Sequence, residues 1–337
     1  MTMTAAIDNR GEKDYTAKIR AIADTLASWD GPIVIISHVD PDGDALGSTL
    51  TLKRALEALG RSAILPLDPP GFLRFLAEPG ELSAPLPALP EHCLLAVLDV
   101  EVGERATGAP IDQAEFVINI DHHGTNTRLG DLSCVQPGRA ATAHIIKDLV
   151  DALGVTWTPE IATPCLTGIL TDTGNFRFAN TTPEVLEAAG ELIAEGVAYS
   201  DLTDRLQWRN PSYFVMLGKV MSTVEFPLDG RMVMAHLSQQ MVNEVGQTED
   251  DSDDFVGVIR YAEGSLVAVF LKEREDHTKI SVRTRGGISA QAICVRLGGG
   301  GHPAAAGAKV HAGLEETRRR VIESAAQELR EGGYEVS

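Results

Sequence analysis

The sequence predicts an α/β protein in which a doubly wound, mostly parallel sheet is followed by a second, smaller α/β domain across a cleft. Apolar runs that suit strands buried on both faces alternate with segments of helical periodicity, which is typical of parallel sheets. After about residue 206 this pattern breaks and restarts with new strands, which indicates the second domain. Three of the apolar runs end directly on polar residues: 32–36 before Ser37-His38, 93–98 before Asp99, and 116–120 before Asp121.

The elements of the first domain follow from apolar spacing and from Gly, Pro and capping signals. Residues 1–16 are expected to form a flexible leader, and 17–29 an amphipathic helix that enters the first strand. A second strand is expected at 62–67, before a passage rich in Pro and Gly that is typical of loops. Further helices are predicted at 46–59, 142–153, 159–170, 183–195 and 201–208.

The second domain begins after a break in the helical pattern at Arg209-Asn210-Pro211. We place the first domain at 17–205, a linker at 206–228 and the second domain at 229–337. An acidic run at 249–254 is expected to cap a helix, because carboxylates suit the N-terminal end of the helix dipole. The remaining predicted elements are strands at 232–237, 266–272 and 279–283 and a helix at 289–297.

Composition limits the classes of function. With 44% hydrophobic and 23% charged residues, the 337-residue chain is typical of globular proteins and long enough for two cores. Its formal net charge of −19 opposes the binding of long nucleic acids, which depends on many contacts between cations and phosphates. The four cysteines form no close pair, and residues 1–15 lack the apolar segment of a signal peptide. No run approaches the ~18 apolar residues of a membrane span, so we expect a cytoplasmic protein without a membrane partner.

A constellation of acidic residues and histidines follows the predicted strands and helices. Each of them alone would more often be a helix cap or a loop residue, but parallel strands bring their carboxyl ends to one edge, where ligands bind. The set can converge on two ions about 3.5–4 Å apart, with Asp99 as the candidate bridge. Oxygen-rich donors suit Mn²⁺ or Mg²⁺, and such ions would lower the pKa of a bridging water. The candidate metal ligands are His38, Asp42, Asp44, Asp99, His122 and Asp172.

Five segments together resemble a known family, the DHH phosphoesterase superfamily. Its four motifs are similar to segment 38–48 (HVDPDGDALGS), Asp99, 121–123 (DHH) and 171–174 (TDTG). Segment 298–307 (GGGGHPAAAG) resembles the signature of the DHH-associated C-terminal domain. The resemblance covers the chain from about residue 17 to its end. Length and layout are similar to the short subfamily of oligoribonucleases that also remove the 3′-phosphate of pAp (adenosine 3′,5′-bisphosphate).

The resemblance implies two divalent metal ions as cofactors, Mn²⁺ in the first instance, with Mg²⁺ or Co²⁺ as alternatives. Asp121 is expected to orient a ligand histidine, and His123 to face the substrate phosphate. Asp40 stands where several relatives carry Asn or Arg, and a supporting role behind the ligands is expected for it. If a hydroxyl helps the site, Thr142 must supply it. The implied ligand sets are His38 with Asp42 for one ion and Asp44 with His122 for the other, with Asp99 bridging and Asp172 completing the site.

In the second domain, a glycine run allows close approach of the backbone to a ligand and offers N–H groups to a phosphate. With the family signature, this predicts substrate binding by Gly299, Gly300, Gly301 and His302. The resemblance also suggests that a basic residue here binds the 5′-phosphate of the substrate, and we favour Arg283 over Arg285. Lys279 and Arg177 are either further contacts or surface cations.

The expected activity is hydrolysis of very short 5′-phosphorylated oligoribonucleotides, such as pApA, to mononucleotides, and dephosphorylation of pAp, through a hydroxide activated by two metals. A fixed distance between the phosphate-binding residues and the metals would select short substrates. Two alternatives stay open: a phosphodiesterase for cyclic di-AMP, and a non-catalytic nucleotide sensor. A sensor would be expected to have lost ligands, whereas all six positions are filled. Relatives are often dimers, so a homodimer is a further alternative.

Overall fold

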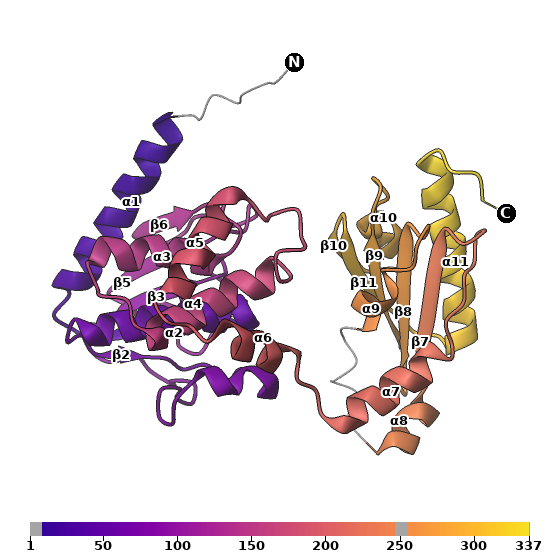
Figure 1. The fold of residues 1–337 in the computed structure, drawn as a ribbon, viewed down its shortest axis with the longest axis horizontal. Coiled ribbons are helices and arrows are strands. Elements are labelled where there is room, and N and C mark those ends of the chain that lie inside the picture. Colours follow the sequence, from indigo (N-terminus) through magenta and orange to yellow (C-terminus); the bar gives the residue numbers. More distant parts are fainter. Residues whose placement is uncertain (1–8, 247–254, 337) are drawn as a thin grey trace. The chain divides into compact units, whose positions relative to one another are not determined.

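The computed structural model describes residues 9–246 and 255–336, and the chain divides into two compact units, Met1–Trp208 and Arg209–Ser337 (Figure 1). The first unit contains helices that alternate with strands, as the sequence predicts. Its helices are α1 (Asn9–Ser28), α2 (Gly43–Ala58), α3 (Thr142–Leu153), α4 (Pro159–Asp172), α5 (Pro183–Ala194) and α6 (Tyr199–Gln207), with short 3₁₀ helices η1 (Gly71–Leu76) and η2 (Ile111–Gln113). Within residues 9–246 and 255–336, every helix is too short or too polar to span a bilayer.

The sheet of the first unit has the strand order β2-β1-β3-β5-β6, and all these neighbours are parallel. A short strand, β4, pairs antiparallel with the end of β1. The chain enters the sheet at β1, moves to β2 on one side and then to β3 on the other, so the strand order reverses between β1 and β3. In such sheets ligands bind at the carboxyl ends of the strands beside this point. The strands are β1 (Ile33–His38), β2 (Ala63–Ile64), β3 (Leu94–Leu98), β4 (Ala106–Thr107), β5 (Phe116–Asp121) and β6 (Leu132–Val135).

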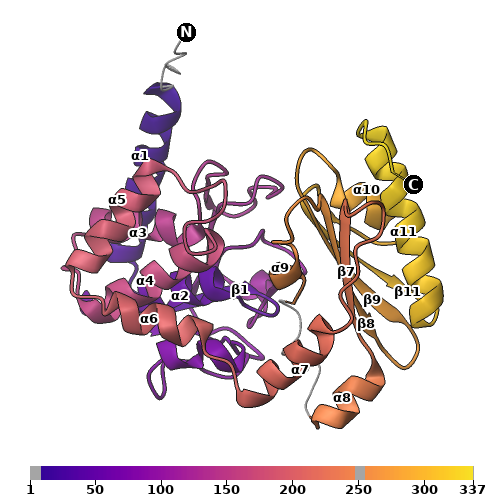
Figure 2. The same cartoon turned by 45° about the vertical axis from the view of Figure 1, so that its right-hand side comes forward.

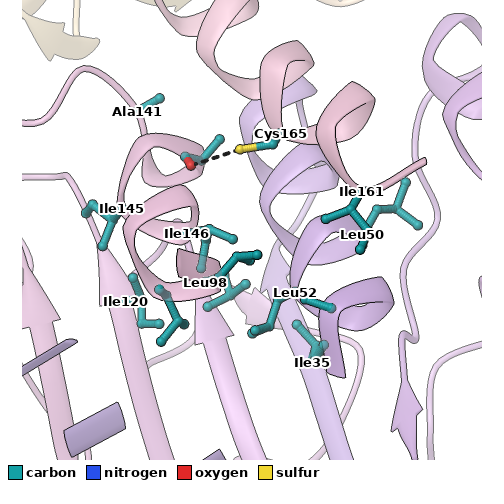
Figure 3. Close-up of a cluster of buried hydrophobic side chains, with 14 of the residues drawn as sticks. Ile35, Leu50, Leu52, Leu98, Ile120, Ala141, Ile145, Ile146, Ile161 and Cys165 are labelled. Atoms are coloured by element: carbon teal, nitrogen blue, oxygen red, sulfur yellow. Dashed lines mark hydrogen bonds between the residues drawn. The ribbon is translucent and has the colours of Figure 1, made fainter. Parts of the chain in front are cut away.

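Both faces of this sheet are buried, which explains why its strands are continuous apolar runs. One face contributes Ile35, Leu98 and Ile120 to a core shared with α2, α3 and α4 (Figure 3). The opposite face, with Val34 and Val97, is covered by connecting segments that carry residues such as Leu89 and Ile111. The connections therefore pass over both faces, but α-helices cover only one of them.

Two glycines let α2 and α4 pack closely, and this contact positions two parts of the candidate site. A Cβ atom on Gly47 would lie 2.4 Å from the carbonyl oxygen of Pro164, and one on Gly168 would lie 2.8 Å from Oδ1 of Asp44. Any side chain at either position would push the helices apart. The close contact holds the first turn of α2 beside the last turn of α4, which ends at Asp172.

The second unit contains a mixed sheet with the order β10-β11-β9-β8-β7, in which β7 and β8 are parallel and the other neighbours antiparallel. Helices α10 and α11 lie on one side of this sheet, and α9 lies on the other (Figure 2). The strands are β7 (Met232–Leu237), β8 (Val267–Glu273), β9 (Thr278–Thr284), β10 (Gly300–His302) and β11 (Ala305–Val310). The helices are α7 (Pro211–Met221), α8 (Gln239–Val245), α9 (Phe255–Ile259), α10 (Ala290–Val295) and α11 (Leu314–Glu331).

The segment that we expected to be a linker, 206–228, instead contains helix α7. Its residues Tyr213, Met216 and Val220 recur at helical spacing and are buried against the core of the second unit. Asn210 caps the helix, since its side chain accepts a hydrogen bond from the backbone N–H of Tyr213, and Pro211 occupies the first turn. The same Arg209-Asn210-Pro211 sequence that suggested a break is therefore a helix start.

Other boundaries also differ from the expectation. Helix α1 begins at Asn9, so it takes up half of the expected leader, whose first eight residues lie outside the described residues. The acidic run at 249–254 lies outside the described residues too. The second strand is shorter than predicted, and β4 and β6 were not predicted because each is only a few residues long.

Candidate metal centre

The six residues predicted to bind metal ions lie together at the carboxyl edge of the first sheet. His38 ends β1, Asp99 follows β3, and His122 follows β5. Asp42 and Asp44 open α2, and Asp172 closes α4. Their donor atoms form two groups in which all atoms lie within 4.8 Å of one another, namely His38 with Asp42 and Asp99, and Asp44 with His122 and Asp172. His123, a seventh residue, forms a third such group with Asp99 and His122.

The first group has an imidazole oriented for coordination. Nε2 of His38 lies 3.8 Å from Oδ1 of Asp42 and 3.6 Å from Oδ2 of Asp99. Its Nδ1 lies 2.8 Å from the carbonyl oxygen of Val39. Donation of Nδ1–H to that carbonyl leaves the lone pair of Nε2 directed at the carboxylates, an arrangement common for ligating histidines. Asp42 is fixed because its Oδ1 accepts hydrogen bonds from the first backbone N–H groups of α2.

In the second group, Nε2 of His122 lies 3.2 Å from Oδ2 of Asp172 and 3.9 Å from Oδ2 of Asp44. The same nitrogen lies 3.6 Å from Oδ1 of Asp99. Asp99 therefore directs one carboxylate oxygen at each group, Oδ2 at His38 and Oδ1 at His122. A carboxylate placed in this way can be shared by two ions.

The N-terminus of α3 holds two of these carboxylates. Ala141, at the N-cap position of α3, has no side chain that could cap the helix, and Asp44 replaces that cap from α2. The two carboxylate oxygens of Asp44 accept hydrogen bonds from the backbone N–H groups of Thr142 (2.6 Å) and Ala143 (2.8 Å). The hydroxyl of Thr142 donates to Oδ1 of Asp99 at 2.8 Å, so the predicted hydroxyl lies at the site.

The donor set fits a hard divalent cation. Burial and the charge of Asp44 raise the pKa of Asp172 to about 8 and that of Asp99 well above its usual range. Burial also raises the pKa of Asp44 itself. Crowded carboxylates of this kind remain ionised only if cations neutralise them. The separations of 3.2–3.9 Å between donor atoms in different side chains approach the ~3 Å expected of neighbouring ligands on an ion with bonds of about 2.1 Å.

Asp121 was expected to orient a ligand histidine, but it bonds to His123, the histidine expected to face the substrate. Its Oδ1 lies 2.7 Å from Nδ1 of His123 and also accepts the backbone N–H of that residue. Both histidines reach Asp99, since Nε2 of His122 lies 3.6 Å and Nδ1 of His123 3.8 Å from its Oδ1, and Asp121 faces Nδ1 of the second one. Asp121 raises the pKa of His123, whose side chain is 47% exposed.

Asp40, by contrast, is exposed at the apex of the loop between β1 and α2. Its backbone has φ +56°, in the left-handed region that non-glycine residues seldom adopt. The side chain of Asp40 is therefore not buried behind the metal-ligand candidates. Its supporting role stays a prediction.

The residues predicted to bind substrate lie on β9 and β10 of the second unit or directly beside these strands. In register, His302 on β10 pairs with Ala305 on β11, which pairs with Arg283 on β9, so the three share one face of the sheet. Arg285 lies beyond the end of β9, and its guanidinium donates to the carbonyl oxygens of Ser265, Arg260 and Ala262. Arg285 therefore has a structural role within this unit.

The glycine run forms one side of a hairpin rather than a loop. Gly300 and Gly301 belong to β10, and Gly301 has φ +135°. A Cβ atom on Gly299 would lie 2.2 Å from the carbonyl oxygen of Gly307 in the facing strand. Close approach of two backbones accounts for at least this glycine without a ligand.

Two buried asparagines of the site were missed. Asn119 on β5 and Asn126 in the following loop are linked by a hydrogen bond, and Asn126 also donates to Oδ2 of Asp121. The sequence carries one signal for the first of them: Asn119 is the single polar residue in the apolar run 116–120.

Comparison with known proteins agrees with this geometry. Residues 32–169 match the model of the DHH family, N-terminal domain, and residues 235–331 match that of the DHHA1 domain. The chain is 55% identical over 327 residues to a bifunctional oligoribonuclease and PAP phosphatase of Thermus thermophilus, covering 97% of this chain and 99% of the relative. A protein of the same description from Bacillus subtilis is 27% identical, covering 87% of this chain and 94% of the relative.

A solved structure of similar fold is an exopolyphosphatase-related protein from Bacteroides fragilis. It has a TM-score of 0.80 and 21% sequence identity, and the match covers 98% of this chain and 99% of that one. At this identity the likeness is one of fold. It extends over both units, so the order of the two sheets along the chain is shared.

Proposed function

The chain belongs to the DHH family of phosphoesterases, and from that premise we propose that it hydrolyses very short 5′-phosphorylated oligoribonucleotides, such as pApA, and removes the 3′-phosphate of pAp. The observation that carries the proposal is the position of Asp99, whose two carboxylate oxygens face two separate donor groups. The substrate class is supported by the description of the relative that is 55% identical. Both substrates are cut at the same bond, between phosphorus and the 3′-oxygen.

We assign His38 and Asp42 to one divalent ion, and Asp44, His122 and Asp172 to the other, with Asp99 shared. Mn²⁺ is the first candidate, and Mg²⁺ or Co²⁺ would accept the same oxygen-rich set. Bound there, such ions neutralise charge on the phosphoryl oxygens and lower the pKa of the attacking water. The chain's own task is to hold the donors in place, through the caps of α2 and α3 described above.

His123 is the proposed proton donor. It is half exposed, and its Nδ1 lies 3.8 Å from Oδ1 of Asp99, so it borders the ligand cluster without being enclosed by it. Asp121 stabilises its protonated form. A protonated imidazole in this place can donate to a non-bridging phosphate oxygen or to the departing 3′-oxygen as the phosphorus–oxygen bond breaks.

Arg283 is the proposed contact for the terminal phosphate. Burial and the neighbouring cation Arg260 lower the pKa of its guanidinium, and among the described residues no carboxylate forms an ion pair with it. A half-buried cation of this kind favours an anionic ligand, and arginine suits bidentate phosphate binding. We extend the contact to His302 and the N–H groups of Gly299, Gly300 and Gly301, in and directly before β10 of the neighbouring β10–β11 hairpin.

The test is product analysis over time on pAp, pApA, cyclic di-AMP and a labelled 24-mer, with Mn²⁺ and with EDTA. We expect metal-dependent release of mononucleotides from pApA and of the 3′-phosphate from pAp, with the 24-mer nearly unchanged. Preferential turnover of cyclic di-AMP would replace this function with a second-messenger phosphodiesterase. Absence of turnover on all four substrates would favour a nucleotide sensor.

A further inference from the structure

A buried carboxamide holds the backbone on both sides of Asp99. Asn119 is fully buried in β5, and its Nδ2 donates to the carbonyl oxygens of Val97 (3.1 Å) and Val100 (2.7 Å). Between these two carbonyls stands Asp99, with φ +61° in the left-handed region. Residues other than glycine seldom adopt this conformation, and it persists only where the surroundings enforce it. Asn119 supplies two of the enforcing contacts.

A second carboxamide continues the network towards His123. Asn126 is 4% exposed, and its Nδ2 donates to Oδ1 of Asn119 at 2.9 Å and to Oδ2 of Asp121 at 2.6 Å. Its own Oδ1 accepts the backbone N–H of Arg128 at 2.7 Å. The other oxygen of Asp121 accepts from His123. An unbroken chain of hydrogen bonds therefore runs from the backbone around Asp99 to the imidazole of His123.

We propose that Asn119 and Asn126 are positioning residues that fix the carboxylate of Asp99 and the imidazole of His123 in one common geometry. The role of His123 in this inference rests on the proposed function, whereas the role of Asp99 rests on its place in the ligand cluster. Pairing of β5 with β3 does not require a polar side chain, because backbone groups already form that ladder. Two buried amides are costly unless they are bonded, and here all four of their N–H donations lead towards Asp99 and Asp121.

The two ends of the network predict different defects. Asn119→Asp keeps the shape and the acceptor for Asn126, but it removes the N–H donors and sets an anion against two carbonyls. We expect it to weaken Mn²⁺ binding, measured by calorimetry, by about 10–100-fold. Asn126→Ala releases Asp121 and His123 instead. We expect it to lower kcat on pApA by about 10–100-fold while the Kd for Mn²⁺ stays within about threefold of the parent.

Leu26→Ala is the matched control, because Leu26 is fully buried in α1 and its truncation costs stability without touching the network. Melting curves ensure that all variants are compared below their unfolding temperatures. The inference is overturned if the asparagine variants lower only the melting temperature, or if Leu26→Ala changes Kd and kcat in the same way. If Asn119→Asp does not fold, Asn119→Ser removes the two amide N–H donors without adding charge. If the parent hydrolyses none of the substrates, the proposed function fails, and the Mn²⁺ affinity of the Asn119 variant still tests the network.

Discussion

The two sheets of this protein place ionisable groups in opposite ways. In the first unit, parallel strands bring Asp99 and two histidines to one edge, where burial and mutual repulsion raise the pKa values of the carboxylates. In the second unit, antiparallel strands spread cations over a face. Half-buried Lys279 on β9 stands in register with exposed Lys309 on β11, and Arg283 lies further along the same strand as Lys279, whereas Lys272 on β8 is buried.

This difference matches two kinds of chemistry. Strand ends in a parallel sheet converge, so they can supply several ligands to a small ion. Residues on the face of a sheet repeat at the spacing of strands, about 4.8 Å, which suits an extended anion better than a single ion. We infer that reactivity resides in the first unit and recognition in the second. The predictions that follow test this division, beginning with the largest expected effect.

The first prediction concerns the boundary between the two units, which places helix α7 in the second unit. A fragment 209–337 should fold, whereas a fragment 229–337 loses the burial of Tyr213, Met216 and Val220, each of which contributes roughly 1.5–3 kcal/mol. That sum approaches the whole stability of an ordinary domain. The free energy of unfolding of each fragment is measured by urea titration followed by circular dichroism. Equal stability of the two would mean that 206–228 is a linker after all.

Neutralising Asp99, the carboxylate that we propose is shared by two ions, should greatly reduce reactivity without affecting recognition. Asp99→Asn keeps the shape of the side chain but removes its charge, and we expect kcat/KM for pApA to fall about 1,000-fold, since metal-assisted charge stabilisation is worth several kcal/mol. Asp112→Asn, on the exposed side of η2, is the control for loss of one negative charge. A loss below about tenfold would contradict a shared carboxylate.

Changes to the second unit should act on binding instead. For Arg283→Gln we expect KM for pApA to rise about 10–100-fold with little change in kcat, because a charged hydrogen bond contributes about 1.5–3 kcal/mol. Arg285→Gln should lower the melting temperature instead, because the guanidinium's three hydrogen bonds to backbone carbonyl oxygens are lost. Arg319→Gln, on the exposed face of α11, is the charge control. A purely kcat defect in the Arg283 variant would place this residue in the chemistry.

The metal-free protein should be less stable at pH 8 than at pH 5. The pKa of Asp172 is about 8 in the folded protein and near 3.8 ordinarily, so between these values the folded state holds a proton that the unfolded chain has released. The free energy of unfolding then falls as the pH rises. His38 acts in the same direction: burial opposes its charge, but hydrogen bonds to Asp42 and Asp99 raise its pKa to about 10.

We expect melting temperatures in EDTA to fall by a few degrees from pH 5 to pH 8, and Mn²⁺ to reduce or reverse this trend because cations replace the protons. Differential scanning calorimetry in buffers of matched ionic strength measures both series. A melting temperature in EDTA that does not change from pH 5 to pH 8 would show that the carboxylates do not repel one another in the folded protein.

The sequence was sufficient for β1, β3 and β5 and for bringing the six candidate ligands to one edge, because both follow from the topology of a parallel sheet. Runs such as 93–98 can be recognised as buried strands, and parallel pairing then requires their ends to meet. No comparable rule gives the partner of a side chain. Asp121 could be placed at the site, but its bond to His123 depends on the local path of the chain.

Some features were missed because the contacts that define them join residues far apart in the sequence. Others were missed because the same sequence pattern is typical of two different structures. Asn119 acts on carbonyl oxygens about twenty residues earlier, and nothing in its neighbourhood indicates those acceptors. Asn210-Pro211 is equally typical of a loop and of a helix start, and only the buried spacing of Tyr213, Met216 and Val220 decides between them. The strand β10 was hidden because its glycines carry no apolar pattern.

All donors of the candidate centre come from residues 38–172, within the first unit. During synthesis these residues emerge before the second unit, Arg209–Ser337, has been made. At ~5–20 residues per second, translation of that unit takes on the order of 10 s, which is long compared with the folding of a small domain. The nascent chain would therefore be able to acquire its metal ions while still attached to the ribosome, before the part proposed to recognise substrate exists.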